Sequence, residues 1–238
     1  MKLDILAFGA HPDDVELGCG ATIAKEIAAG KKVGIVDLTR GELGTRGSAE
    51  IRDAEAAKAA AILGVSAREN LRFRDGFFTN DEQHQKEIIK MIRKYRPEIV
   101  LCNAVDDRHI DHGKGSKLVS DACFLSGLIR IETEAEGIKQ DAWRPKQVYH
   151  YIQWKNLTPD FVVDVSDFIQ QKIDAVMAYG SQFYDPDSKE PVSPIATKNF
   201  TESIEYRAKD LGRLVFCDYA EGFIVERYLA VNSLSDLK

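Results

Sequence analysis

The sequence of 238 residues has few cysteines, and its four are far apart with no CxxC pair. This spacing excludes a disulfide framework and a thiolate zinc site, so we expect reduced, mostly buried thiols at Cys19, Cys102, Cys123 and Cys217. No apolar run approaches the roughly 18 residues that a membrane span requires. The opening "KLDILAFGA" is too short for a secretory leader and is typical of a first strand, which predicts a cytoplasmic protein.

Positive charge is also scarce. The 32 Lys and Arg residues are outnumbered by 38 Asp and Glu residues, for a net charge of -6 and a pI near 5.5. No segment has the density of basic residues that binding to a nucleic-acid backbone requires. A chain that is 44% hydrophobic and 29% charged is ordinary for a globular protein. We expect a single domain with neither a nucleic-acid nor a membrane partner.

Apolar runs and helical patterns alternate along the first half of the chain. In order, they occupy residues 3–10, 20–30, 31–39, 49–64, 70–75, 81–96 and 97–104. Such alternation predicts an α/β fold, Rossmann-like, with a mainly parallel sheet flanked by helices. We expect this core to span about residues 1–125 and a C-terminal β/α elaboration to span about residues 126–238 of the same domain.

Two charged loops follow the first and fourth expected strands. The first is "FGAHPDDVELGCG" and the second is "NAVDDRHIDHG". Pro12 keeps the first loop from continuing as a helix and favours a tight turn. Because strand-to-helix loops of a parallel sheet share one edge, we expect the side chains of the two loops to converge.

The histidines and carboxylates of these loops suit a catalytic zinc ion, which takes three protein ligands and leaves a position open for water. The most economical ligand set is His11, Asp14 and His112. Zinc lowers the pKa of its bound water to about 7. Asp13 is then free to take the proton of the water, and His109 to protonate the leaving group or stabilise the oxyanion.

Several alternatives stay open at this point. Asp111 is expected to hold a ligand histidine in its working tautomer. Fe²⁺ and Co²⁺ accept the same donors as zinc. Taken alone, "AHPDD" is more typical of a turn followed by a helix N-cap than of a metal site. His84 and His150 have no comparable neighbours, and we expect them to be surface or core residues.

Three motifs together resemble one family. "AHPDD", "GELGTRG" followed by Arg52 and Glu55, and "HIDHG" resemble the PIG-L (LmbE-like) zinc-dependent N-deacetylases. Within the family, the start "DILAFGAHPDDVELGCGATIAK" is most similar to the deacetylases of bacillithiol biosynthesis, which act on N-acetylglucosaminyl-malate. The motifs extend from residue 3 to about residue 120.

The resemblance implies the ligands and proton-transfer residues named above, a small amino-sugar conjugate as substrate, and a homo-oligomer. It also implies that Arg52 faces the substrate, where a guanidinium holds a malate carboxylate well. The alternative is that Arg52 pairs with Glu55 at helical spacing. Arg46 and Arg108, on loops beside the site, are further candidates for the malate end.

Two other functions compete with this one. The same chemistry suits another N-acylated sugar or amine, such as a chitooligosaccharide or a mycothiol-type conjugate. A Rossmann-type nucleotide-binding module is an alternative of a different class, since Gly18 and Gly20 form part of a GxGxxG pattern. Its pyrophosphate would bind at the start of the first helix, where Asp13, Asp14 and Glu16 would repel it.

Overall fold

The computed structural model describes residues 1–236, and in them a seven-stranded sheet has the order β3-β2-β1-β4-β7-β9-β8. Strands β3 to β7 of this order run parallel, and β9 is antiparallel to both β7 and β8. The strands are β1 (Ile5–Gly9), β2 (Val33–Thr39), β3 (Ala67–Phe73), β4 (Ile99–Cys102), β7 (Gln147–Tyr151), β8 (Phe161–Asp164) and β9 (Ala220–Val225). A separate hairpin consists of β5 (Glu134–Ala135) and β6 (Ile138–Lys139).

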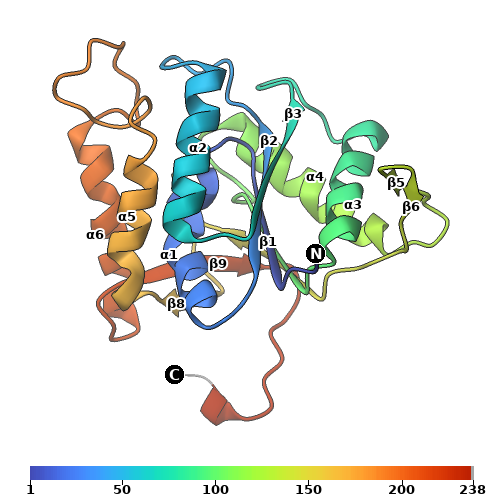
Figure 1. The fold of residues 1–238 in the computed structure, drawn as a ribbon. Helices are drawn as coiled ribbons and strands as arrows, with labels where there is room; N and C mark the ends of the chain where they lie inside the picture. Colours follow the sequence, from blue (N-terminus) through green and yellow to red (C-terminus); the bar gives the residue numbers. More distant parts are fainter. Residues whose placement is uncertain (237–238) are drawn as a thin grey trace.

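Helices cover both faces of the sheet (Figure 1). One group comprises α1 (Asp14–Ala28), α2 (Ala49–Leu63) and α5 (Ile169–Met177), and the other comprises α3 (Glu82–Tyr95) and α4 (Ile110–Ser126). Helix α6 (Lys198–Leu214) packs on β9, and the short turns η1 (Ser166–Phe168) and η2 (Leu234–Asp236) complete the chain. No helix among the described residues is long and apolar enough to cross a membrane.

Strand β1 shows why the apolar runs are nearly continuous. All its residues are buried. Ile5 and Ala7 belong to the hydrophobic cluster under α1, α2 and α5, whereas Leu6 and Phe8 belong to the cluster under α3 and α4. A strand whose two faces are both covered by helices needs apolar side chains at every position. The predicted Rossmann-like, mainly parallel fold is confirmed.

The element boundaries differ from the expected ones in several places. Helix α1 begins at Asp14 rather than at residue 20, and it continues across a kink at Cys19. Acidic residues in a first turn interact well with the helix dipole, so the charged loop itself starts the helix. Strand β3 begins at Ala67 rather than at residue 70. Neither α6 nor β9 was predicted as an element.

A buried ion network ties α1 to the sheet. The Arg68 guanidinium on β3 donates to Asp37 at 2.8 and 2.9 Å and to Glu16 Oε1 at 2.5 Å. The hydroxyl of Tyr179 donates to the same Glu16 oxygen. Burial raises the pKa of Asp37, and the neighbouring Arg68 opposes that rise.

The cysteines, His84 and His150 lie in the kinds of position that the sequence predicts. The four cysteines are free, and only Cys217 is not fully buried. His150 is buried in β7, and His84 is partly exposed on α3.

Candidate active site

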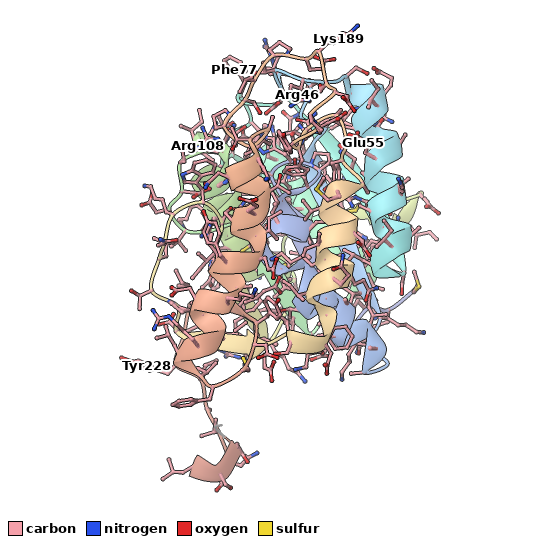
Figure 2. The ribbon with its side chains drawn as sticks, turned by 90° about the vertical axis from the view of Figure 1, so that its left-hand side faces the viewer. Arg46, Glu55, Phe77, Arg108, Lys189 and Tyr228 are labelled. Carbon is pink, nitrogen blue, oxygen red and sulfur yellow. The ribbon has the colours of Figure 1, made fainter. Side chains whose placement is uncertain are left out.

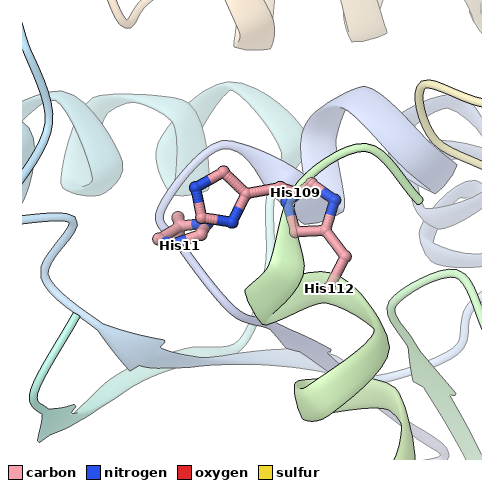
Figure 3. A group of neighbouring side chains, drawn as sticks. All are labelled: His11, His109 and His112. Atoms are coloured by element: carbon pink, nitrogen blue, oxygen red, sulfur yellow. The ribbon is translucent and has the colours of Figure 1, made fainter. Parts of the chain in front are cut away.

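The two charged loops meet at the carboxyl ends of β1 and β4. These strands are neighbours, but α1 and α4 leave them toward opposite faces of the sheet. Such a switch point is where open α/β sheets bind ligands. His11 comes from the β1–α1 loop, while His109 and His112 come from the start of α4 (Figure 3). One ring nitrogen from each of these three histidines lies within 4.8 Å of one ring nitrogen from each of the other two.

Asp14 joins two of these histidines. Its Oδ2 lies 3.4 Å from His11 Nδ1, and its Oδ1 lies 3.1 Å from His112 Nε2. The carboxylate is oriented by Asn103 Nδ2, which donates at 3.0 Å, and by Gln153 Nε2, which donates at 2.9 Å. Neither amide was predicted from the sequence, although Asn103 directly follows β4, where functional side chains were expected.

Carboxylates also hold the far nitrogen of each expected ligand histidine. His11 Nε2 lies 3.0 Å from Asp75 Oδ1 and 3.5 Å from Asp111 Oδ2. His112 Nδ1 lies 2.5 Å from Asp107 Oδ2. Metal-ligating histidines usually carry such a partner, which fixes the ring and leaves the other nitrogen to face the metal. Asp111 lies beside His11, one of the expected ligand histidines, whereas Asp75 and Asp107 were not predicted.

The donor set fits a divalent cation. Nitrogen and oxygen donors from His11, Asp14 and His112 are the ligands that zinc, Fe²⁺ and Co²⁺ share. Burial alone lowers the pKa of His112, but Asp14 and Asp107 raise it to about 9. The side chains around the histidines therefore create a strongly negative environment that favours a cation.

A second group of possible donors consists of His11, Asp75 and Asp111. Asp111 is engaged by Lys114 Nζ at 2.6 Å and by the Gly76 N–H at 2.7 Å. The Lys114 ammonium lies beside Oδ1, and the Gly76 N–H binds Oδ2, the same oxygen that lies near His11 Nε2. Asp75 and Asp111 are therefore better suited to support His11 than to bind a metal themselves.

Asp13 lies beside this cluster in a strained conformation. It is the N-cap of α1 with φ of 115°, a backbone conformation that costs about 1–3 kcal/mol for a residue other than glycine. Arg52 Nη2 donates to Asp13 Oδ2 at 2.9 Å and to the Pro12 carbonyl at 2.7 Å. Burial raises the pKa of Asp13 to about 7, against the effect of Arg52. Glu55 does not pair with Arg52, because it accepts hydrogen bonds from Ser181.

His109 is held in one tautomer. Its Nδ1 accepts the backbone N–H of Asp111 at 3.2 Å, so the proton of the neutral ring lies on Nε2. Burial lowers the pKa of His109, and so does positive charge on His11 and His112. A neutral ring with a free Nε2–H can donate a proton or a hydrogen bond to a reacting group.

A cavity of about 520 Å³ opens over these residues. Arg46 and Arg108 line it, at the same end of the molecule (Figure 2). Arg46 is only 4% exposed, yet among residues 1–236 it has no ion pair with a carboxylate. Its Nη2 donates to Ser188 Oγ at 2.6 Å, and its buried Nε has no hydrogen-bond partner. Arg108 is exposed, with its guanidinium 4.7 Å from the ring centre of Trp154.

Known proteins match this sequence and fold. Residues 6–123 match the family model "PIG-L: GlcNAc-PI de-N-acetylase". The chain is 32% identical over 190 residues to the diacetylchitobiose deacetylase of Thermococcus kodakarensis, which covers 75% of this chain and 70% of that protein. The chain belongs to the PIG-L family. It is accordingly an N-deacetylase, a hydrolase that acts on amides.

Two further relatives agree with this membership. The PIG-L chain superposes on a conserved protein of Thermus thermophilus with a TM-score of 0.85 and 35% identity, over 97% of this chain and 98% of that one. It is also 28% identical over 194 residues to the 1D-myo-inositol 2-acetamido-2-deoxy-alpha-D-glucopyranoside deacetylase of Corynebacterium jeikeium, covering 62% of this chain and 57% of that protein.

Gly18, one of the two glycines that suggested a nucleotide site, has another explanation in this PIG-L fold. A Cβ added to Gly18 would lie 2.1 Å from the ring of Tyr151. Gly18 is therefore required by the packing of α1 on that ring, with no need for a phosphate.

Proposed function

We propose that this PIG-L deacetylase removes the acetyl group from an N-acetylglucosaminide with an anionic aglycone, and that N-acetylglucosaminyl-malate of bacillithiol biosynthesis is its substrate. The acyl C–N bond breaks, water supplies the oxygen that joins the acyl carbon, and acetate and a free amine leave. The relatives named above support an acetylated amino sugar, since their names specify such substrates. The anionic aglycone rests on the buried, unpaired Arg46.

Zinc is the proposed metal, and His11, Asp14 and His112 would hold it. When bound, a divalent metal supplies a Lewis acid that polarises the amide carbonyl and makes water easier to deprotonate. Fe²⁺ or Co²⁺ would suit the same three side chains.

Proton transfer is assigned to two residues of the chain. Asp13 takes the proton of the attacking water, and Arg52 keeps the Asp13 carboxylate aimed at one position through the 2.9 Å contact. His109 donates its Nε2 proton to the leaving nitrogen, since Nδ1 is occupied by the Asp111 N–H. Asp111 and Asp75 keep His11 oriented.

Arg46 is the proposed binding residue for the anionic aglycone. A buried charge without a counter-charge is costly, and an anionic substrate group would supply the missing partner. Arg108, on the opposite loop, is the proposed second contact. A hydrogen bond to a charged group contributes about 1.5–3 kcal/mol, which corresponds to about a 10- to 150-fold effect on kcat/KM.

The test compares N-acetylglucosaminyl-malate with methyl N-acetylglucosaminide. We expect the wild-type enzyme to prefer the malate conjugate, and Arg46→Gln to lose most of that preference while its turnover of the neutral sugar changes little. Arg74→Gln is the matched control, because Arg74 is an exposed arginine that stacks on Phe77. Equal kcat/KM for the two sugars in the wild-type enzyme would remove the malate assignment.

A chitooligosaccharide is the second candidate, favoured by the 32% identity to a diacetylchitobiose deacetylase. Including N,N'-diacetylchitobiose in the same assay decides between the two. A higher kcat/KM for chitobiose than for the malate conjugate would establish the second candidate in place of the first.

A further inference from the structure

The cavity extends beyond the histidines, along one face of α6. Its lining includes Phe200, Ile204, Ala208 and Leu211, which recur at helical spacing. At about 1.5 Å per residue, they extend about 16 Å along the helix. Leu17 of α1 and Ile152, just after β7, line it too. We call the space between these six side chains the apolar limb.

Three charged side chains line the cavity near the limb, and each bonds within the protein: Arg207 Nη2 of α6 donates to the Lys155 carbonyl at 3.4 Å, and Lys172 and Glu221 bond to each other. Lys172 Nζ donates to Glu221 Oε1 at 2.6 Å, and both residues are buried. Glu221 also accepts the backbone N–H groups of Ala21 and Thr22 at the α1 kink. Because Lys172 and Glu221 bond to each other, and Glu221 also accepts the two N–H groups of α1, this ion pair needs no polar ligand in the limb.

Four of the six apolar side chains of the limb, in contrast, are not fully covered. Leu17, Ile152, Phe200 and Leu211 are each only partly buried, although they lie on elements that pack against the core. Helix α6 packs on β9, and the limb lies beside that contact. Partly exposed apolar side chains that line one concave space are typical of a site for an apolar ligand group.

The limb and the rim of the cavity differ in polarity. The rim carries Arg46 and Arg108, which suit a sugar and its polar aglycone. Leu17 lies one helical turn after Asp13, so the limb begins beside the reacting groups. Of the two substituents of an N-acyl sugar amide, only the acyl group is apolar.

We propose that the apolar limb binds the acyl chain of the scissile amide, so that the enzyme also hydrolyses N-acylglucosamine conjugates with chains longer than acetyl. The proposal rests on the proposed function, because it uses the same amide and the same catalytic residues. The bond changes are unaltered: the C–N bond breaks, water supplies oxygen to the acyl carbon, and a longer carboxylic acid leaves with the free amine.

The first experiment is a chain-length series on one sugar. N-acetyl, N-butanoyl and N-hexanoyl glucosaminyl-malate are compared by kcat/KM. Burying a methylene in apolar surroundings predicts a gain of about three- to fourfold per carbon while the chain stays inside the limb. A hexanoyl value below about one hundredth of the acetyl value overturns the proposal, because one methylene too many for a closed pocket costs about 10- to 200-fold.

The series separates this proposal from the proposed function. If the acetyl conjugate is hydrolysed and the longer ones are not, the limb assignment alone fails. If the longer conjugates are hydrolysed and the acetyl one is not, the limb assignment stands and the acetyl substrate is wrong. A further substrate in the same kcat/KM comparison is an N-acetylglucosaminide with a hexyl aglycone. A gain for this glycoside without a gain for the hexanoyl amide would overturn the acyl assignment, because the limb would then hold the aglycone.

A variant that fills the limb is the second test. Ala208→Phe is expected to lower the ratio of hexanoyl to acetyl kcat/KM at least about tenfold. Tyr206→Trp adds bulk to the exposed side of α6 and should leave the ratio unchanged. An unchanged ratio in a folded Ala208→Phe enzyme contradicts the proposal.

A binding measurement covers the case in which Ala208→Phe does not fold. Asp13→Asn is expected to bind both conjugates with kcat lowered about 10²- to 10⁴-fold, so calorimetry reads affinity with little interference from turnover. Tighter binding of the hexanoyl than of the acetyl conjugate supports the limb, and equal or weaker binding contradicts it.

Discussion

The contact between Asp107 and His112 offers a sharp test of the metal site. Asp107 Oδ2 lies 2.5 Å from His112 Nδ1, while Oδ1 accepts the Lys155 N–H at 2.8 Å. Asp107→Asn keeps a carbonyl oxygen for Lys155 but removes the negative charge beside the imidazole. Losing such a partner typically weakens metal affinity about 10- to 100-fold, or about 1.4–2.7 kcal/mol.

Competition with a chelator of known affinity measures this loss for Asp107→Asn. The melting temperature of the metal-loaded variant should also fall, by about 3–11 °C for a chain of this size. Asp106→Asn is the matched control, since the Asp106 carboxylate is exposed and pairs with Lys155 Nζ at 2.7 Å rather than with a histidine. Equal metal affinity in the two variants would refute the assignment of His112 as a ligand supported by Asp107.

Two further predictions concern packing and buried charge. Gly18→Ala should lower the free energy of unfolding by about 1–3 kcal/mol, because the added Cβ would lie 2.1 Å from the Tyr151 ring. Gly20→Ala should be neutral or stabilise the protein by up to about 1 kcal/mol. Similar urea midpoints for the two variants would contradict this prediction. Arg68→Met should cost about 3–5 kcal/mol at pH 7, because it leaves the Asp37 carboxylate buried without its cation. Burial raises the pKa of folded Asp37, so its protonation favours folding, and the deficit relative to wild type should shrink as the pH falls from 8 toward 4. A deficit that stays constant over that range would refute the reasoning.

The fold could be predicted because its signals are local. Strand β1 is buried on both faces, so every residue from Ile5 to Gly9 is small or apolar, and turn residues mark its ends. The C-terminal elements were harder to predict. Helix α6 is rich in charged residues, and β9 pairs only with strands distant in the sequence, so neither has a strong local pattern.

The candidate site also contains residues that the sequence predicts and residues that only the folded structure brings into it. His11 and His112 lie in motifs that directly follow strands, so the topology alone brings them together. Asp75 lies in a third loop without any motif, and only the folded chain shows it against His11. Arg52 was expected to face the substrate, and the structure places its guanidinium on Asp13, a contact that spans 39 residues of sequence.

The measurement that tests the central claim most directly determines bound metal and turnover together in Asp13→Asn. The claim is that His11, Asp14 and His112 hold the metal while Asp13 moves the proton. The variant and the wild-type enzyme should therefore both retain about one metal ion per chain, and the variant should lose about 10²- to 10⁴-fold in kcat. Full turnover by Asp13→Asn, or loss of its metal, would contradict this division of roles.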